Sequence, residues 1–466
     1  MSETIPVRQS TARAVRRGEI MDENATREWI AREMRSGVSS WSRVASGASR
    51  ATVIVGLDDG REVVARIDTG DGPMAGTELT LAREGTMYRA LSGQPVRMPG
   101  CHAVSDDGTV LLLERASGVH DYGEVAQADK HRIYTDYIDA LAELHSVDTT
   151  RLDLPGFARP VTAADHATME LDLWERILDQ RTRQPWPLAR FAFAVLRRHA
   201  PASVSRTVVC HGDVGPGNFL HDGSRVTAML DWEFSHLGDP MDDLGWWLFR
   251  GHDINGDCGD LDAQLARWEQ TTGIPINRAS IAYYRVFVML RWLVSVAAVV
   301  DTGGAGMDRS VHHLLVPTLG VLLPRGLAEV IGHDLPPAPP APDGVEPLGA
   351  AAAEAAMSDV MTVLMPAATD PESKRRLGAS IAYLSHLMSI DRVGPAVRAE
   401  LHDAASALLG SSRPTLAEVD ASVSGGLGTL GDAALLDYFW RAGHARAALW
   451  PLVQGRTAQP LTPILR

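Results

Sequence analysis

The sequence is poor in cysteine and in lysine. Its 466 residues include three cysteines, Cys101, Cys210 and Cys258, which lie far apart. An odd number at such spacings gives neither a disulfide framework nor a zinc-binding motif, which is typical of a protein from a reducing cytoplasm. Lysine occurs only as Lys130 and Lys374, so arginine supplies most of the basic side chains.

Positive charge is also in short supply. The chain has 44 Lys and Arg against 58 Asp and Glu, a net charge of −14. A nucleic-acid-binding protein needs a basic surface to neutralise phosphates, so we expect no nucleic-acid partner. The hydrophobic content of 45% excludes a largely disordered protein, and the length allows two or three domains with their own cores.

Long apolar runs are missing as well. The longest stretch, residues 292–300, is shorter than a membrane span. The first 20 residues carry several charges and lack the apolar core of a signal peptide, so we expect them to form a flexible N-terminus. Together these features predict a cytoplasmic protein without a membrane partner.

The segment richest in polar motifs is HGDVGPGN, residues 211–218, which is followed by Asp231-Trp232-Glu233. Residues 207–210 predict a buried strand that leads into this motif, and residues 226–230 predict a second short strand that ends at Asp231. We expect the two strands to pair as a hairpin with the acidic residues at its open end.

These residue types suit phosphoryl transfer. The reaction needs a carboxylate that orients and deprotonates the attacking hydroxyl, and oxygen ligands for magnesium. Asp213 suits the first role, and Asn218 and Asp231 suit the second. The HGD triplet alone often marks only a turn, but the full spacing is much rarer. The pattern therefore indicates a small-molecule kinase that uses ATP and Mg²⁺.

The motifs resemble those of the aminoglycoside phosphotransferase superfamily. This resemblance implies an α+β, two-lobed protein-kinase-like fold with an antiparallel-sheet N-lobe and a mainly helical C-lobe. His211 and Glu233 would support the site. The continuation at residues 234–245 also resembles the family, which would make Asp243 a buried brace of the catalytic loop; a helix N-cap is the alternative.

The resemblance also implies three elements upstream of the motif. Residues 44–55 are typical of strand, small-residue turn and strand, in which backbone N–H groups at Ser46, Gly47 and Ser49 could approach phosphates; an ordinary hairpin is the alternative. The strand at residues 62–67 carries Arg66 where most kinases have lysine. Glu84, in a predicted helix, would pair with it, although both could be surface charges.

An adenine-binding hinge is implied after the buried strand at residue 110. By its order in the chain, the hinge would place Glu114 and Ala116 against ATP. A predicted helix ends at His145, for which a structural role is favoured. A later apolar helix carries Arg285 and Arg291, which would favour a phosphate-bearing substrate if they faced the cleft.

A proline-rich run separates the last part of the chain from the rest. Helical patterns follow it, and they predict an all-helical bundle of about one hundred residues. We therefore expect a kinase truncated after Leu335 to fold on its own. Whether the protein forms a homodimer stays open. The predicted divisions are a flexible N-terminus at 1–20, an N-lobe at 21–116, a C-lobe at 117–334, a linker at 335–348 and a helical bundle at 349–466.

The resemblance is closest to the branch fused in animals to acyl-CoA dehydrogenases, and the bundle weakly resembles small helical companion proteins of one branch. The resemblance to the acyl-CoA dehydrogenase branch implies a small-molecule substrate with a hydroxyl group on a CoA thioester, namely a hydroxyacyl-CoA. An aminoglycoside or other antibiotic, a sugar or an amino alcohol stays open. Two other classes are a nucleotide-binding pseudokinase and a metal-dependent hydrolase built on His211, Asp213, Asp231 and Glu233.

Overall fold

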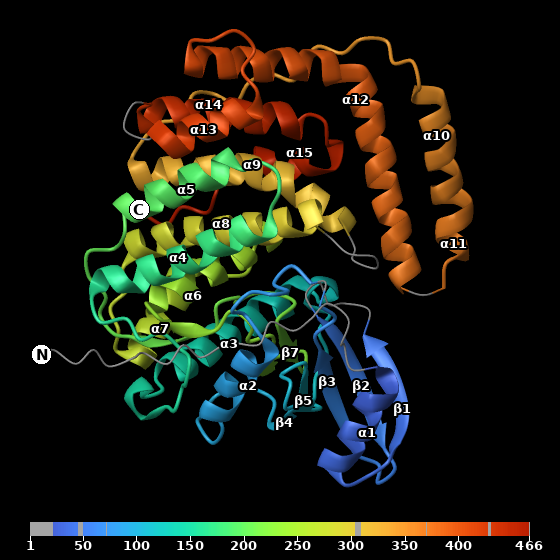
Figure 1. Ribbon diagram of the computed structural model, residues 1–466, viewed down its shortest axis with the longest axis vertical. Coiled ribbons are helices and arrows are strands. Elements are labelled where there is room, and N and C mark those ends of the chain that lie inside the picture. Colours follow the sequence, from blue (N-terminus) through green and yellow to red (C-terminus); the bar gives the residue numbers. More distant parts are fainter. Residues whose placement is uncertain are drawn as a thin grey trace, which may run out of the picture.

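The computed structural model describes residues 22–44, 50–70, 72–302, 309–369, 371–426 and 430–465. Figure 1 shows a small lobe with a β-sheet, a larger helical lobe next to it, and a C-terminal set of helices on the far side of that lobe. The chain passes through these three parts in sequence order, so the arrangement follows the order of the predicted segments.

The N-terminal lobe is built on a five-stranded antiparallel sheet in the order β1-β2-β3-β5-β4. Alternate residues of a strand point to opposite faces. In β5, Val110 and Leu112 therefore pack on the side of helix α1, whereas Leu111 and Leu113 join the main core of the molecule. The elements are α1 (Glu23–Met34), β1 (Val38–Val44), β2 (Ala51–Leu57), β3 (Glu62–Ile67), α2 (Leu81–Ala90), β4 (Cys101–Val104) and β5 (Val110–Glu114).

The C-terminal lobe packs helices around the long apolar helix α8 (Arg278–Thr302), which is buried along most of its length. Helices α4, α5, α6 and α9 all contact it. The other elements are η1 (Tyr122–Glu124), α3 (Gln127–His145), η2 (Thr149–Arg151), α4 (Ala163–Arg181), α5 (Pro187–Arg198), β6 (Val208–Cys210), β7 (Phe219–His221), β8 (Val226–Met229), β9 (His236–Gly238), α6 (Pro240–Trp247), η3 (Leu248–Asn255), α7 (Leu261–Thr272) and α9 (Arg309–Ile331).

The predicted hairpin of the two motif strands is wrong. Strand β6 pairs with β9, and β8 pairs with β7, so the two predicted strands belong to different two-stranded sheets. The cause is the unpredicted strand β7, which begins directly after Asn218. The turn that follows it returns the chain to β8, so that β7 and β8 form a local hairpin. The Leu230 N–H still donates to the Asn218 carbonyl at 2.8 Å, which brings the metal-ligand candidates together by a different route.

Two helices have the length and composition of membrane spans, contrary to the estimate from apolar runs. They are α8 and residues 312–331 of α9, with mean hydropathy of 1.5 and 1.6. In α8, 83% of the apolar window is buried within the protein. Such burial is typical of core helices, because a helix that is apolar all round can pack inside a large lobe.

Arg285 and Arg291 do not reach a cleft. Arg291 pairs with both carboxylate oxygens of Asp242, at 2.7 and 2.8 Å, and its guanidinium lies 4.0 Å from the centre of the Phe287 ring. Arg285 is fully buried between Asp253 and Glu329. Both arginines are therefore occupied in the core, and neither supports a phosphate-bearing substrate.

The C-terminal helical module, residues 350–465, packs on helices α5 and α9 of the C-lobe. Phe191 of α5 stacks on Phe439 of α14 with ring centres 5.4 Å apart, and buried residues of both parts belong to one continuous core. This shared core argues against independent folding of a chain truncated after Leu335. The module contains α10 (Ala350–Asp359), η4 (Val360–Leu364), α11 (Met365–Ala367), α12 (Pro371–Leu409), α13 (Leu416–Gly426), α14 (Asp432–Ala447) and α15 (Pro451–Ala458).

Helix α12 continues through Pro395. A proline inside a helix removes one hydrogen bond and crowds the preceding turn, so it normally ends or kinks the helix. Here the linker covers that turn: the Val345 N–H donates to the Arg392 carbonyl at 2.9 Å, and the Gly349 N–H donates to Asp391 at 2.6 Å. These tertiary contacts satisfy polar groups next to the proline.

Candidate active site

The HGD motif forms a tightly bonded loop after β6. Gly212 has φ +81°, and a Cβ atom there would lie 2.2 Å from the Phe234 carbonyl oxygen, so the position requires glycine. The His211 ring donates through Nε2 to the Leu230 carbonyl at 2.8 Å and accepts at Nδ1 from the Asp213 N–H at 3.3 Å. Burial lowers the pKa of His211, so the ring is neutral and links the loop to β8.

Asp243 holds the same loop from helix α6. Its carboxylate accepts hydrogen bonds from the backbone N–H groups of His211 at 2.7 Å and Gly212 at 2.9 Å, and from His145 Nε2 at 3.0 Å. The N-cap of α6 is Asp239 instead. In this structure Asp243 therefore contacts the catalytic loop and does not cap the helix, and His145 is one of its partners.

Asp213 is held at both carboxylate oxygens. Oδ2 accepts from Asn218 Nδ2 at 2.5 Å, and Oδ1 accepts from Arg250 Nη1 at 2.6 Å. Burial raises the pKa of Asp213 to about 6, although Arg250 acts in the opposite direction. A carboxylate with a pKa near neutrality and a fixed orientation is suited to accept a proton from a substrate hydroxyl.

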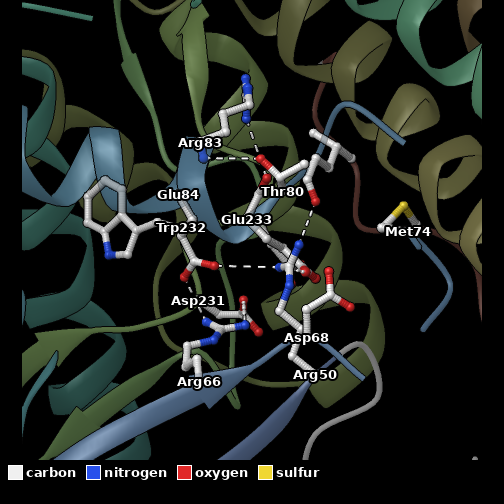
Figure 2. Close-up of polar contacts among 12 residues, drawn as sticks. Arg50, Arg66, Asp68, Met74, Thr80, Arg83, Glu84, Asp231, Trp232 and Glu233 are labelled. Atoms are coloured by element: carbon white, nitrogen blue, oxygen red, sulfur yellow. Dashed lines mark hydrogen bonds and ion pairs between the residues drawn. The ribbon is translucent and has the colours of Figure 1, made fainter. Parts of the chain in front are cut away.

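Asp231 joins the two lobes. It has φ +66°, a left-handed conformation that is uncommon outside glycine and that recurs at functional sites. Arg66 of β3 donates to Asp231 at 2.7 Å and to Glu84 of α2 at 2.9 Å. Figure 2 shows Arg66 between the two carboxylates. The strand cation, the helix carboxylate and the motif aspartate are thus in one cluster, which includes the pairing of Arg66 with Glu84 that the resemblance implied.

The cluster contains a second arginine that sequence reasoning missed. Arg50, at the start of β2, donates to Glu233 at 2.6 Å and to the Leu79 carbonyl at 2.5 Å, and it lies 3.5 Å from Glu84. Figure 2 shows Arg50 beside Glu84, linked to it by a dashed line, and Arg66 below Glu84 next to Asp231. The only signal in the sequence is that Arg50 directly follows the small-residue turn.

The charge balance of this cluster fits a cation. Two arginines face the carboxylates of Glu84, Asp231 and Glu233. Burial, followed by repulsion from Asp231, raises the pKa of Glu233 to about 8. For Asp231, burial acts in the same direction, but attraction to Arg66 holds its pKa below the ordinary value. The raised pKa of Glu233 reflects the burial and the crowding of three carboxyl groups, and a divalent cation would relieve that crowding.

Asn218 and Asp231 could provide the ligands for Mg²⁺. The Asn218 amide nitrogen is bonded to the Asp213 carboxylate and carbonyl, at 2.5 and 2.8 Å, so its oxygen is the atom that remains for a cation. Magnesium is usually bound by one or two protein oxygens, with phosphates and water completing the shell. The donor set therefore fits the metal.

The remaining predicted contacts lie at the edge of this site or outside the described residues. Ser46, Gly47 and Ser49 are not among the residues that the structure describes. Glu114 ends β5, and its N–H donates to the Gly100 carbonyl at 2.7 Å. Ala116 follows on the connector. An adenine contact at Glu114 and Ala116 stays a prediction.

A family model matches the part of the chain that contains this site. The model is described as "Phosphotransferase enzyme family" and covers residues 40–283, which is more than half of the chain. The chain belongs to this phosphotransferase family. The family is one of phosphotransferase enzymes, in agreement with the predicted enzyme class.

The phosphotransferase is similar to animal proteins of the acyl-CoA dehydrogenase family. It is 27% identical to acyl-CoA dehydrogenase family member 11 of Gallus gallus over 249 residues, which are 50% of this chain and 31% of that protein. For the Rattus norvegicus protein the identity is 30% over 219 residues, or 43% of this chain and 27% of that protein. The chain thus spans less than a third of the length of these relatives.

A solved structure shows the fold. A protein from Ralstonia eutropha JMP134, assigned to the aminoglycoside phosphotransferases, superposes with a TM-score of 0.51 at 22% identity. The match covers 67% of this chain and 99% of that chain. The predicted two-lobed, protein-kinase-like α+β fold is confirmed.

Proposed function

We propose that this phosphotransferase transfers the γ-phosphate of Mg·ATP to the hydroxyl group of a hydroxyacyl-CoA. The observation that carries the proposed chemistry is the position of Asp213 beside Asn218, with Asp231 and Arg66 completing the site. Support for the acceptor comes from the similarity to acyl-CoA dehydrogenase family members, which covers 50% and 43% of this chain for two of them.

Each side chain has a distinct task in this proposal. Asp213 orients the substrate hydroxyl and accepts its proton, while Arg250 and Asn218 hold the two oxygens of its carboxylate. Asn218 and Asp231 would hold Mg²⁺, and Arg66 would reach phosphate oxygens. When bound, Mg·ATP supplies the γ-phosphoryl group. Glu84 accepts a hydrogen bond from Arg66 and thereby keeps its guanidinium oriented.

The structure gives reasons against the hydrolase alternative. Both ring nitrogens of His211 are engaged by the backbone of Leu230 and Asp213, so neither is directed at a metal. Within the described residues there is no group of three or more His, Cys, Asp and Glu side chains arranged to hold a metal ion. A metal in this site would therefore depend on ligands from a bound phosphate.

The pseudokinase alternative is weaker for a similar reason. Arg66 stands in for the usual lysine and already contacts both Glu84 and Asp231, so the substitution keeps the expected ion pair. Arginine also binds phosphate oxygens in a fork geometry. An aminoglycoside, another antibiotic, a sugar or an amino alcohol remains an alternative acceptor, and a substrate panel separates these classes.

The test is ADP release from Mg·ATP with hydroxyacyl-CoAs, aminoglycosides and small alcohols, with the Asp213→Asn variant as matched control. Hydroxyacyl-CoA should be turned over by the native protein, and the variant should be slower by about 10³-fold because the base is lost. Turnover restricted to another class would overturn the acceptor. Full activity of Asp213→Asn would overturn the role of Asp213.

A further inference from the structure

The catalytic loop is held by one continuous helical segment, which consists of α6 and the π-helix η3. Asp243 of α6 bonds the backbone of the loop at its start. Arg250 of η3 bonds its end: Nη1 contacts the Asp213 carboxylate, and Nη2 donates to the Pro216 carbonyl at 2.5 Å. Short π-helices are rare and occur frequently at functional sites.

Arg250 fits closely into this loop. Gly215 has φ +154°, and a Cβ atom there would lie 2.5 Å from the Arg250 Cβ, so the loop and the arginine are in direct contact. The guanidinium also lies over the Trp292 ring of α8, 5.7 Å from its centre. The orientation of the proposed base thus depends on where η3 lies.

The position of η3 is in turn fixed by the last residues of the chain. The Thr462 N–H donates to Asp253 Oδ1 at 2.7 Å, and Asp253 lies three residues after Arg250 on η3. Arg285 of α8 donates to the Thr462 carbonyl at 2.7 Å and lies 3.5 Å from Asp253. Asp253 and Arg285 are almost fully buried. Two residues later, Ile464 is fully buried in the main core.

We propose that the C-terminal tail, residues 461–464, positions the catalytic base through η3 and Arg250. Thr462 and Arg250 are then positioning residues, because they act through Asp213 and do not need to touch the substrate. Among the described residues, the tail is the segment outside the C-lobe that bonds Asp253, and it belongs to the C-terminal helical module. The module would therefore be part of the kinase mechanism. This proposal rests on the proposed function in one respect, the role of Asp213 as base.

Thr462→Pro is the most selective test. The substitution removes the amide hydrogen that bonds Asp253, in a segment that already has Pro460 and Pro463 on either side. Thr462→Ser is the matched control because it keeps both the amide and the hydroxyl group, which also bonds Asp253. Asp253→Ala removes the same bond from the η3 side, and Arg285 keeps Glu329 as an ion-pair partner.

The kinetic expectation is a split between kcat and binding. Thr462→Pro and Asp253→Ala should each lower kcat about tenfold, and Arg250→Ala about 10²-fold, because small displacements of a catalytic group have effects of this size. The dissociation constant for Mg·ATP should stay within about twofold. Thr462→Ser should match the native protein. Arg250→Ala combined with Thr462→Pro should be no slower than Arg250→Ala, since both act along one path.

Hydrogen–deuterium exchange of the protein without substrate gives a second readout. In Thr462→Pro, exchange should become faster than in Thr462→Ser for residues 248–255 and also for residues 211–218. Faster exchange confined to residues 459–465, or kinetic effects of Thr462→Pro and Arg250→Ala that multiply, would overturn the proposal. This readout needs no turnover, so it decides the role of the tail even if hydroxyacyl-CoA proves not to be the acceptor.

Discussion

The two halves of the active site are built from different kinds of contact. In the C-lobe half, Asp243 and His211 bond backbone groups of the catalytic loop. In the N-lobe half, Arg50 and Arg66 are bonded mainly to the side chains of carboxylates from distant segments. Backbone contacts fix a loop in one conformation, whereas ion pairs between side chains can be exchanged for those with a ligand. We therefore expect the first half to be rigid and the second to reorganise when nucleotide binds.

Asp231 belongs to both halves, so its substitution should have the largest effect. Asp231→Asn removes a proposed Mg²⁺ ligand and the partner of Arg66. The affinity for Mg·ATP should fall by about 10²-fold, in line with about 3 kcal/mol for a charged ligand contact. Calorimetric titration with ATP, with and without Mg²⁺, provides the measurement. An equal loss in both titrations would show that Asp231 contacts the nucleotide without a metal.

Asp243→Asn tests the rigidity of the C-lobe half. The carboxylate accepts three hydrogen bonds, from two backbone N–H groups and from His145. An amide has one acceptor oxygen, and its NH₂ group would face a donor, so the free energy of unfolding should fall by about 3 kcal/mol. Urea unfolding measures this. A change below about 0.5 kcal/mol would mean that the loop keeps its conformation without Asp243.

Asp239 shows that this half also contains an unfavourable group. It is buried at the N-cap of α6, and burial raises its pKa from 3.8 to about 7. Between these values the folded chain keeps a proton that the unfolded chain releases, so the free energy of unfolding falls as pH rises through this window.

In Asp239→Asn that contribution disappears. The variant should match the native protein near pH 4 and should gain stability relative to it, by about 4 kcal/mol, above pH 7. Thermal unfolding across this pH range measures the difference. Parallel curves for the two proteins would show that Asp239 is ionised in the folded state, in contrast to the expectation from its burial.

Much of the C-lobe half could be predicted from the sequence because its residues are close together in the chain. The HGD motif, Asn218 and the strand before Asp231 lie within about twenty residues. In the N-lobe half, strand β3 with Arg66 could also be predicted, from its apolar pattern alone. Glu84 was found only because the family pattern requires a helix carboxylate after that strand.

The parts that were missed depend on distant contacts. Arg250 follows Asp213 by 37 positions and lies in a π-helix, for which no simple sequence pattern exists. Strand β9 is three residues long, and its pairing with β6 depends on how the loop between them folds. The unbroken helix α12 depends on the linker contact at Arg392, which local propensity cannot show.

Arg66→Lys tests whether the N-lobe half needs a guanidinium. Arg66 contacts Glu84 and Asp231 through two different nitrogens, and a lysine ammonium would serve both with more difficulty. The affinity for Mg·ATP should fall about tenfold, equivalent to about 1.4 kcal/mol, with little change in folding. Unchanged or higher affinity would show that arginine is not specifically required at this strand position.

Arg50→Gln should have the smallest effect, and it tests the exchange of ion pairs most directly. Arg50 donates to Glu233 and to the Leu79 carbonyl, so part of these interactions must be given up before it can bind phosphate. The net loss of Mg·ATP affinity should therefore be about threefold, below the 1.5–3 kcal/mol of a typical charged hydrogen bond. Arg61→Gln is the matched control, because Arg61 lies in the same lobe and pairs with Asp59 outside the cluster. An affinity gain in Arg50→Gln would mean that Arg50 competes with nucleotide for the carboxylates, and the N-lobe half would then be autoinhibited in its resting state.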